Sequence, residues 1–432
     1  MHGAADDRRA EALADGSRLA ARLFDALAGG TADPPGVTRA AYGAGECAAF
    51  ALMAEAAGDL GGDPVFDPAG NQFLTFRGAD RGRTVYVGSH LDSVPHGGNF
   101  DGAAGVILGL AAAAALTRLG TVPAFDLCVL CLRAEESCWF PHSYIGSKTA
   151  LGCLPPDVLD AVVRSDTGRS LAGHMRDLGF DPEAVRRGAS RIDRARTVAY
   201  LEPHIEQGPV LVAEGRPLGL VTGIRGSFRF REAAFHGAYA HSGATPRTLR
   251  RDAVVAASEF VMAMQALWER MERDGHDLAV TFGMIGTDPA QHSFSKVAGE
   301  ARLCIDVRSQ SEATLEEVRR RLVETGLDVA ARRDVRLELG PLGGSTPAVM
   351  APRLLAQMRA AAATAGIAPI EMASGAGHDA ATFANAGVPT GMLFIRNRNG
   401  SHNPDEAMDM GDFDAALALV VALLEQPAEH WG

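Results

Sequence analysis

The sequence predicts an α/β fold, in which a mainly parallel-sheet domain with helices on both faces is interrupted by a smaller two-layer α+β domain. Helix and strand patterns alternate over residues 6–132 and again after Gly343, and this alternation is typical of a parallel sheet covered by helices. Between these parts, the strands alternate apolar and polar residues, as half-exposed strands do. A chain of 432 residues is also long for a single core. We therefore expect a main domain at 1–222 and 340–432, interrupted by an inserted domain at 223–339.

The main domain is predicted from two kinds of short pattern. Its helices space apolar residues three and four positions apart, and its strands are short β-branched or aromatic runs between glycine-rich turns. In the first part we expect helices over 6–28, 44–58 and 102–119, and strands over 71–76, 84–89 and 125–132. In the second part we expect helices over 350–366 and 413–424, and a strand over 390–395.

The inserted domain is predicted from alternating strands and two amphipathic helices. The longer helix, over 251–273, places Val255, Phe260 and Met264 on one apolar side. A second helix is expected over 315–325. Strands are expected over 227–236, 278–285 and 302–308. This order of elements indicates a smaller two-layer domain.

Composition and charge exclude several classes of protein. A formal net charge of −12 argues against nucleic-acid binding, which needs a surplus of Lys and Arg. No apolar run reaches the roughly 18 residues that span a bilayer, and the first twenty residues lack the apolar core of a secretory signal. Six cysteines are few for this length, so we expect free thiols and a cytoplasmic location. We interpret Cys128 and Cys131 as structural residues, because no second cysteine pair completes a zinc site.

Residues that can bind metals follow the predicted strands, where α/β proteins assemble their sites. After the strand over 84–89, His90 and Asp92 are two positions apart, so the Asp92 carboxylate can hold the His90 ring. Asp101 follows a glycine-rich loop and opens the helix over 102–119. A carboxylate there can bridge two cations, or it can simply cap the helix. Sequence position alone leaves both roles open.

Three further motifs contain residues of the same kind. Glu135 and Glu136 come directly after an apolar strand. One of them can bind a metal while the other acts as a general base, or both can form a solvated, charged turn. His204 and His402 each lie in a motif that also contains acids, although a lone histidine is more often a hydrogen-bonded structural residue.

Together these motifs predict a site for two metal ions. One cation would receive two imidazoles and a shared carboxylate, and the other would receive the shared carboxylate, one imidazole and one further carboxylate. Mixed nitrogen and oxygen ligands of this kind suit Zn²⁺, Mn²⁺, Co²⁺ or Ni²⁺. Such a pair of ions activates water, whose proton Glu135 would accept and return to a leaving nitrogen. The candidate ligands are His90, Asp101, Glu136, His204 and His402.

Six strings in the chain carry a resemblance to a known family. They are GSHLDSVPHGGNFDG, AEES, HIEQGP, GAYAHSGATPRTLRRDA, SGAGHDA and NGSHNPDE. In this order they resemble the hydantoinase/carbamoylase family, a branch of the aminoacylase/carboxypeptidase clan of two-metal amidohydrolases. The resemblance extends over residues 36–410. It implies one metal site of His90, Asp101 and His204 and another of Asp101, Glu136 and His402. It also implies that Glu135 is the general base and that Asp92 is an acidic residue that supports the metal ligands without binding a metal.

The resemblance also implies which residues contact the substrate. His241 would stabilise the oxyanion of the tetrahedral intermediate. Gln207 and His378 match positions that contact the carbamoyl group and the substrate. Gly377 belongs to a glycine-containing loop that would let the backbone approach the ligand. These four residues are therefore candidate substrate contacts.

A substrate carboxylate is expected to bind in the inserted domain. Arg308 lies on a strand with Asp306 on the same face, and its guanidinium can clamp a carboxylate through two hydrogen bonds. Family members usually carry an Asn where Ser295 stands here, and Lys296 adds a cation beside it. The basic segment 396–398 replaces another usual family residue. Both departures lie where the tail of the substrate is expected, so they put its identity in question.

Several functions are compatible with these residues. The first is hydrolysis of an N-carbamoyl-L-amino acid to the amino acid, ammonia and CO₂, and the second is allantoate hydrolysis by the same metal chemistry. An aminoacylase or peptidase of the same clan and a non-catalytic homologue are further alternatives, which the HIEQGP and SGAGHDA strings and the retained Glu135 disfavour. The resemblance implies a homodimer formed through the inserted lid/dimerisation domain, and it leaves open whether His241 acts in its own subunit or across the dimer.

Overall fold

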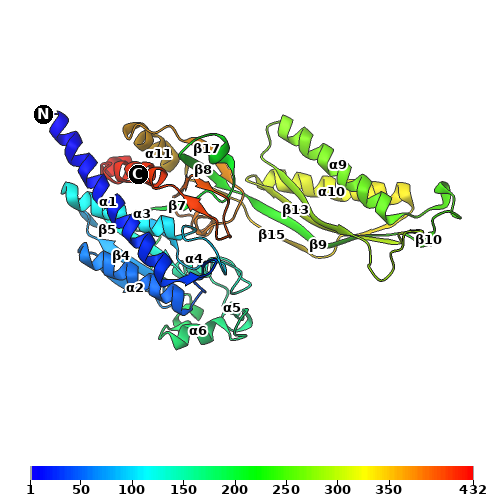
Figure 1. Cartoon of the computed structure of the whole chain (residues 1–432), viewed down its shortest axis with the longest axis horizontal. Coiled ribbons are helices and arrows are strands. Elements are labelled where there is room, and N and C mark those ends of the chain that lie inside the picture. The colour runs from blue at the N-terminus through cyan, green and yellow to red at the C-terminus, as the bar shows by residue number, and fades with distance from the viewer. Residues whose placement is uncertain (1, 432) are drawn as a thin grey trace. The chain divides into compact units, whose positions relative to one another are not determined.

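The computed structural model describes residues 2–431, and for residues 2–6 the backbone only. Contacts divide the chain into unit 1, with residues up to Thr222 and from Val349 onward, and unit 2, Gly223–Ala348 (Figure 1). We expected the insertion to end at residue 339. It continues to Ala348 because the strand β15 (Leu342–Ser345) pairs with a strand of unit 2. Among the described residues, none of the helices combines the length and apolar character that crossing a bilayer requires.

A nine-stranded mixed sheet forms the centre of unit 1. Its strands are β3 (Asp63–Phe66), β4 (Gln72–Phe76), β5 (Asp80–His90), β6 (Phe125–Leu132), β7 (Thr197–Ile205), β8 (Leu218–Ile224), β16 (Ala348–Val349), β17 (Ile370–Ser374) and β18 (Thr390–Ile395). They lie in the order β16-β8-β18-β7-β5-β6-β4-β3, with β17 also paired to β8. The four strands β18, β7, β5 and β6 run parallel, whereas β8 pairs antiparallel with β18, β4 with β6, and β3 with β4.

Helices cover both faces of this sheet, as the alternating pattern predicts. The longer ones are α1 (His2–Gly30), α2 (Ala44–Asp59), α3 (Ala103–Leu119), α11 (Pro352–Thr364) and α13 (Met410–Leu424), and the short α12 (Asp379–Asn385) precedes β18. Helix α3 is buried on all sides over its first eleven residues, because the sheet lies on one side and α1 and α13 on the other. A Cβ at Gly105 would lie 2.0 Å from the Pro203 carbonyl oxygen. The small residues of α3 are therefore what lets it approach the sheet.

The segment between β6 and β7 contains elements that sequence patterns did not predict. Its helices are α4 (Ile145–Ala150), α5 (Val158–Ala161), α6 (Leu171–Asp177) and α7 (Pro182–Arg186), and α8 (Val210–Ala213) follows β7. Trp139, Phe140 and Leu171 belong to a small core of their own. Helices of one to two turns are too short to show a 3.6-residue periodicity, and this is why the pattern missed them.

Cys128 and Cys131 lie in the buried strand in which we expected them. Cys128 and Cys131 are buried within β6 and form no disulfide. Burial raises the pKa of the Cys128 thiol to about 12. A thiol with so high a pKa remains protonated near neutral pH, as is typical of a buried structural cysteine.

The parallel strands bring four chain segments to one edge of the sheet. β5 ends at His90, β6 at Leu132, β7 at Ile205 and β18 at Ile395. His90 pairs with Leu132, and Ile395 pairs with Ile205, so the ends are in register. Because these strands are parallel, the residues after their carboxyl ends gather at the same edge. The short strands β19 (Asn397–Arg398) and β20 (Ala407–Met408) follow β18.

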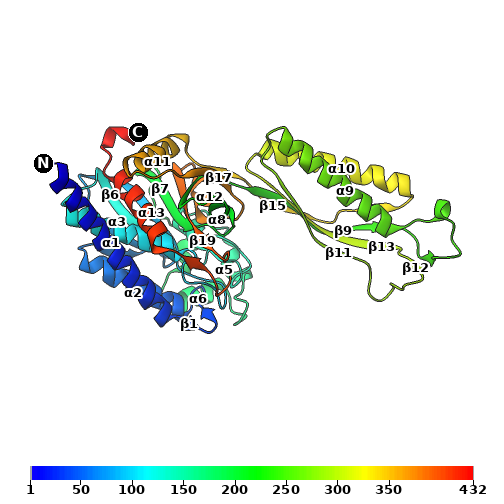
Figure 2. The same cartoon turned by 45° about the horizontal axis from the view of Figure 1, so that its top comes forward.

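Unit 2 is a two-layer domain, as predicted (Figure 2). Its antiparallel sheet contains β9 (Gly226–His236), β11 (Ala279–Gly286), β13 (Glu300–Ser309), β14 (Arg336–Glu338) and β15, in the order β11-β13-β9-β14 with β15 also paired to β9. Helices α9 (Ala253–Arg273) and α10 (Glu312–Arg333) pack on it around Phe235, Phe260 and Val307. Helix α10 extends beyond the predicted end at 325, because Val329 and Ala330 continue its buried side.

Candidate metal centre and active site

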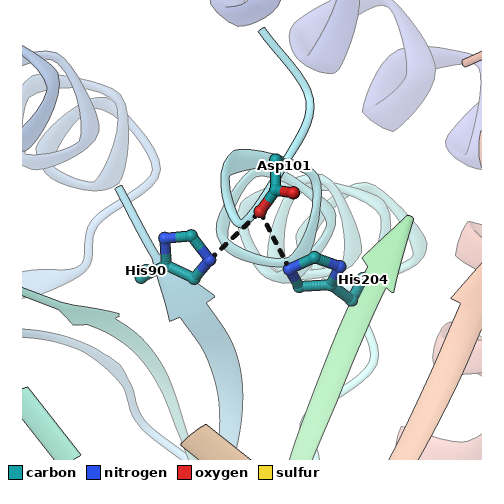
Figure 3. Close-up of side chains that lie close together, drawn as sticks. All are labelled: His90, Asp101 and His204. Carbon is teal, nitrogen blue, oxygen red and sulfur yellow. Dashed lines mark ion pairs between the residues drawn. The ribbon is translucent and has the colours of Figure 1, made fainter. Parts of the chain in front are cut away.

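His90, Asp101 and His204 form the first group that could hold a metal ion (Figure 3). His90 ends β5, His204 lies near the end of β7, and Asp101 stands in the loop before α3. The Nε2 atoms of both histidines lie 3.3 Å from Asp101 Oδ1. That oxygen is buried and accepts no hydrogen bond from any residue that the structure describes. A metal ion fits such a position, because a buried carboxylate oxygen otherwise loses its solvation without compensation.

The backbone at Gly102 brings Asp101 close to the histidines. Gly102 is the N-cap of α3, has a φ of +67°, and leaves the helix without a side-chain cap. Asp101 is therefore not a helix cap, which was the alternative that the sequence left open. A Cβ at position 102 would lie 2.5 Å from the His90 ring, so a glycine is required by both the positive φ and the close approach.

Asp101, Glu136 and His402 form the second group that could hold a metal ion. His402 Nε2 lies 3.1 Å from Glu136 Oε1 and 3.7 Å from Asp101 Oδ2. The two oxygens of Asp101 thus face different groups, with Oδ1 toward His90 and His204 and Oδ2 toward His402. This is the arrangement that a carboxylate shared between two cations requires.

Glu135 and Glu136 are buried, so they do not form the solvated turn that the sequence also allowed. Their backbone N–H groups donate to the two carboxylate oxygens of Asp92, each at 3.0 Å. His90 Nδ1 lies 3.1 Å from the Asp92 carbonyl oxygen and 3.4 Å from its carboxylate. Asp92 therefore links the end of β5 to the end of β6. Glu135 Oε2 lies 4.0 Å from His90 Nε2 and belongs to neither metal group.

The closely spaced acidic residues of this site change the pKa values of their neighbours. Burial raises the pKa of Glu135 well above its usual value. The nearby Glu136 also raises this pKa, whereas His90 lowers it. Burial opposes protonation of His90, but Glu135, Asp101 and Asp92 outweigh it and raise the pKa of His90 well above its usual value. The hydrogen bond with Glu136 raises the pKa of His402 to about 9. The site therefore favours positive charge on its histidines, and cations suit the same positions.

The structure places two of the candidate substrate contacts of unit 1 beside the metal groups. Gln207 Nε2 donates to Asp101 Oδ2 at 2.7 Å and lies 3.3 Å from His402 Nε2. The ring of His378 packs on that of His204, with centroids 4.5 Å apart, and is almost fully buried. Burial and His204 hold the pKa of His378 well below its usual value, so this ring is neutral. At Gly377, a Cβ would lie 1.7 Å from the Tyr144 hydroxyl oxygen.

The remaining candidates belong to unit 2. His241 lies on the short strand β10 (Ala240–His241), is exposed, and accepts the N–H groups of Gly243 and Ala244 at Nδ1. The backbone oxygen of Ser295 accepts the N–H of Ser242 at 2.9 Å. Arg308 donates from Nε and one terminal nitrogen to the two oxygens of Asp306, at 3.1 and 3.0 Å. This fork is the shape that would bind a carboxylate, and in the structure Asp306 occupies it.

Sequence reasoning missed several residues that support the ligands. Glu406 accepts the N–H groups of Phe100 and Asp101, although it lies within the NGSHNPDE string. The fully buried Arg39 donates from Nε to the Leu91 carbonyl oxygen at 2.7 Å, next to His90. Neither contact has a local signal, because the partners are distant in sequence. A charge in an otherwise apolar neighbourhood is the only sequence sign that such a residue has a buried partner.

Comparison with known proteins identifies the family. The family model described as Peptidase family M20/M25/M40 matches residues 86–426. The chain belongs to this family. The N-carbamoyl-L-amino acid amidohydrolase of Geobacillus stearothermophilus is 32% identical to this M20 chain over 396 residues, 91% of this chain and 94% of the relative. The allantoate amidohydrolase of Escherichia coli (strain K12) is 31% identical over 365 residues, 84% and 86% of the two chains.

Solved structures place this M20 protein in one branch of the family. The hydantoinase/carbamoylase family amidase of Burkholderia multivorans has a TM-score of 0.83 and 28% identity, covering 96% of this chain and 99% of its own. The corresponding amidase of Burkholderia ambifaria has a TM-score of 0.82 and 29% identity, covering 95% of each chain. The protein is thus an M20 amidohydrolase of the hydantoinase/carbamoylase subgroup, as the six sequence motifs predict.

Proposed function

We propose that this M20 amidohydrolase uses two divalent metal ions to hydrolyse the carbamoyl (ureido) C–N bond of a small substrate that bears a carboxylate. The preferred substrate is an N-carbamoyl-L-amino acid, which gives the amino acid, ammonia and CO₂. One observation carries the proposal. The two oxygens of Asp101 face two separate ligand groups, and the buried Glu135 stands beside them without belonging to either.

The chemistry of the donors supports the choice of metal. His90, Asp101 and His204 would hold one ion, and Asp101, Glu136 and His402 the other. Both sets mix imidazole nitrogen with carboxylate oxygen, which suits Zn²⁺, Mn²⁺, Co²⁺ or Ni²⁺ and disfavours Mg²⁺ or Ca²⁺. When bound, a pair of such ions polarises a carbonyl group and makes water nucleophilic near neutral pH.

Glu135 is the proposed general base. It accepts the proton of the attacking water and returns this proton to the nitrogen that leaves, so the carboxylate is restored in each cycle. Asp92 supports this role, because its carboxylate holds the backbone N–H groups of both Glu135 and Glu136. Asp92 also lies against the His90 ring, so it orients a metal ligand and the base together.

The remaining assignments for the substrate rest on likeness to the family motifs. Gln207 and His378, beside the metal groups, would contact the carbamoyl group, and the backbone at Gly377 would approach it. Arg308 and Ser295 would bind the substrate carboxylate. The Arg308 guanidinium would then donate its hydrogen bonds to the substrate instead of to Asp306. His241 would stabilise the negative charge on the carbonyl oxygen in the transition state. Its side chain is exposed, and its Nδ1 accepts the N–H groups of Gly243 and Ala244.

Allantoate hydrolysis is the second candidate function. The relatives named for the two activities are 32% and 31% identical to this chain, so likeness favours neither. Allantoate is also a ureido compound with a carboxylate, and the same two metals and Glu135 would cleave it. Ser295 and Lys296 would distinguish the two substrates if their side chains lie beside the tail of the ligand, as the family motifs imply.

A substrate panel tests the proposal. The protein is reconstituted with Mn²⁺, Co²⁺ or Zn²⁺, and ammonia release is measured from N-carbamoyl amino acids, 3-ureidopropionate and allantoate. Release of a free amino acid is measured from an N-acetyl amino acid and from a dipeptide. We expect turnover of at least one N-carbamoyl-L-amino acid with the highest kcat/KM of the panel. A maximum on allantoate would select the second function, and turnover of only the acetyl or peptide substrates would refute ureido cleavage.

We also propose a homodimer that forms through unit 2. β11 is an edge strand of the unit 2 sheet and exposes Met284 and Ile285. An exposed apolar edge strand is a surface that pairs with another chain, and two copies of β11 can pair with each other. Light scattering coupled to size exclusion should give twice the mass of the chain. An Ile285→Lys variant should shift this mass to that of the monomer, and an unchanged mass would exclude this edge.

The six free cysteines support a reducing compartment, and we propose the cytoplasm. Fractionation of cells that express the chain at its natural level tests this location.

A further inference from the structure

Ala134, the residue directly before Glu135, has an unfavourable backbone conformation. Its φ is +51°, in the left-handed region, although it carries a Cβ and is fully buried. Residues other than glycine adopt this region only where their surroundings impose it, and such positions cluster at functional sites. Something in the structure therefore holds the chain at Ala134.

A carboxylate from a distant helix provides this restraint. Glu46, in the first turn of α2, accepts the N–H of Ala134 with Oε1 at 3.2 Å. Its Oε2 accepts the N–H of Tyr42 at 2.8 Å, and the Ala134 carbonyl oxygen accepts the N–H of Ile145 at 3.2 Å. Both polar groups of Ala134 are thus fixed, one of them by a buried acid.

Arg133 keeps this acid in place. Its guanidinium donates to Glu46 Oε2 and, through Nε, to the Gly70 carbonyl oxygen at 2.7 Å. The guanidinium carbon lies 4.0 Å from the centre of the Phe50 ring, and the Arg133 side chain is almost fully buried. A buried ion pair of this kind adds little to stability compared with apolar residues of the same size. We therefore explain the Arg133–Glu46 pair by the backbone that it positions, and not by a contribution to stability.

Three consecutive backbone N–H groups are therefore held by two carboxylates. Glu46 accepts that of Ala134, and Asp92 accepts those of Glu135 and Glu136. The two acids come from different elements, α2 and the loop after β5. Glu46 therefore fixes the residue directly before Glu135, whereas Asp92 fixes Glu135 and the proposed metal ligand Glu136.

We propose that Glu46 and Arg133 are positioning residues, which hold the left-handed turn at Ala134 and thereby place Glu135 for proton transfer. Neither residue belongs to either of the two candidate metal groups. The inference rests on the proposed function, because it uses Glu135 as the general base. Its consequence is a loss in kcat when the pair is disrupted, since a misplaced base slows proton transfer without weakening substrate binding.

The first test is the variant Glu46→Gln. The amide keeps the shape of the side chain, but its NH₂ group would face the backbone N–H of either Ala134 or Tyr42. The neutral amide also cannot form the ion pair with Arg133. We expect kcat to fall roughly tenfold or more, with KM and bound metal unchanged. The matched control is Asp126→Asn at the opposite end of β6, where a buried carboxylate also binds an arginine, Arg77, and a backbone N–H. This control should keep the wild-type kcat. Equal losses in both variants would overturn the proposal.

A second substitution separates positioning from general stability. In the Glu46→Gln background, Ala134→Gly should restore part of kcat, because glycine adopts a positive φ without strain. Its failure to do so in a folded, metal-loaded protein would overturn the proposal. If Glu46→Gln does not fold, Ala134→Val in the wild-type chain replaces it. A β-branched residue is least compatible with this turn, so kcat should fall while KM and metal content stay unchanged, and a wild-type kcat would refute the inference.

A crystal structure of Glu46→Gln distinguishes this inference from the proposed function. We expect residue 134 to leave the left-handed region and the Glu135 carboxylate to move, whatever substrate the enzyme uses. A wild-type protein that turns over none of the ureido substrates would refute the proposed function, whereas an unchanged conformation at residue 134 would refute the positioning role alone.

Discussion

The carboxylate of Glu406 accepts the backbone N–H of Asp101 at 3.1 Å. The same oxygen accepts the N–H of Phe100 at 2.7 Å, and the other carboxylate oxygen accepts the Ser401 hydroxyl at 2.8 Å. Ser401 precedes His402 and also contacts Asp101 Oδ2. The segment that carries His402 is thus bonded to the segment that carries the shared ligand, although 305 positions separate Asp101 from Glu406.

Glu406→Gln should weaken metal binding. The amide can accept the backbone N–H groups, but its NH₂ end cannot accept the Ser401 hydroxyl, so Asp101 loses its orientation. Residues that orient a ligand typically contribute about 10- to 100-fold to metal affinity. Competition with a chelator, followed by metal analysis, measures the change. Glu425→Gln, which removes a charge from the ion pair with Arg9, is the control and should bind metal as the wild type does. Equal affinities in all three proteins would contradict this role.

Glu135→Gln should strongly lower turnover and retain the metals. A glutamine cannot accept the proton of water, and loss of a general base typically lowers kcat by about 10²- to 10⁴-fold. Metal analysis of the same sample checks that both ions remain. Wild-type turnover in this variant would refute the base assignment. The experiment also separates an enzyme from a non-catalytic homologue.

Chelation should remove activity reversibly. Both proposed ligand groups contain histidine, so prolonged exposure to a strong chelator should give an inactive protein, and Zn²⁺, Mn²⁺, Co²⁺ or Ni²⁺ should restore activity. Titration with one ion while activity is recorded should require two equivalents per chain. Full activity of a metal-free sample, verified by metal analysis, would exclude the two-metal mechanism.

Arg308→Ala should raise KM for substrates with a carboxylate. Removing a charged hydrogen-bonding partner typically costs about 1.5–3 kcal/mol, roughly a 10- to 150-fold change in KM, and kcat should change less. The control is Arg302→Ala on the same strand, where the arginine is largely exposed and pairs with Glu300. Steady-state kinetics on anionic substrates decides the point, and an unchanged KM would rule out the carboxylate role.

Asp379→Asn should change how the stability of the metal-free protein depends on pH. Asp379 is fully buried, receives a hydrogen bond from Ser147 at Oδ1, and has no donor at Oδ2 among the described residues. Burial, together with Glu202, raises its pKa from 3.8 to about 8. Because the folded-state pKa is raised, this carboxyl favours the folded state fully below its unfolded pKa of 3.8, and the contribution is lost as pH rises to about 8.

Urea unfolding of the wild type and the variant at several pH values measures this effect. The free energy of unfolding of Asp379→Asn, relative to that of the wild type, should increase with pH between about 4 and 8, by up to about 1.4 kcal/mol per pH unit, and then level off. A constant difference over this range would show that Asp379 titrates normally.

Much of the main domain could be predicted because its signals are local. The strands over 125–132 and 390–395 coincide with β6 and β18, since buried strands of a parallel sheet are continuous apolar runs. The end of the inserted domain was predicted too early, at 339, because the exposed, glycine-containing β15 has no apolar pattern. The short helices between β6 and β7 were missed for a similar reason.

The sequence by itself determined which side chains could serve as ligands and base, because His90, Glu136 and His402 lie at or after the ends of strands whose pattern is visible locally. Only the tertiary structure decided how these side chains are held. Glu46 on Ala134 and Glu406 on Asp101 are hydrogen bonds between residues far apart in the chain, and no periodicity records them. The physical reason is that an amphipathic pattern specifies which face of an element is buried, whereas the partner of a buried charge is specified only when the elements pack together.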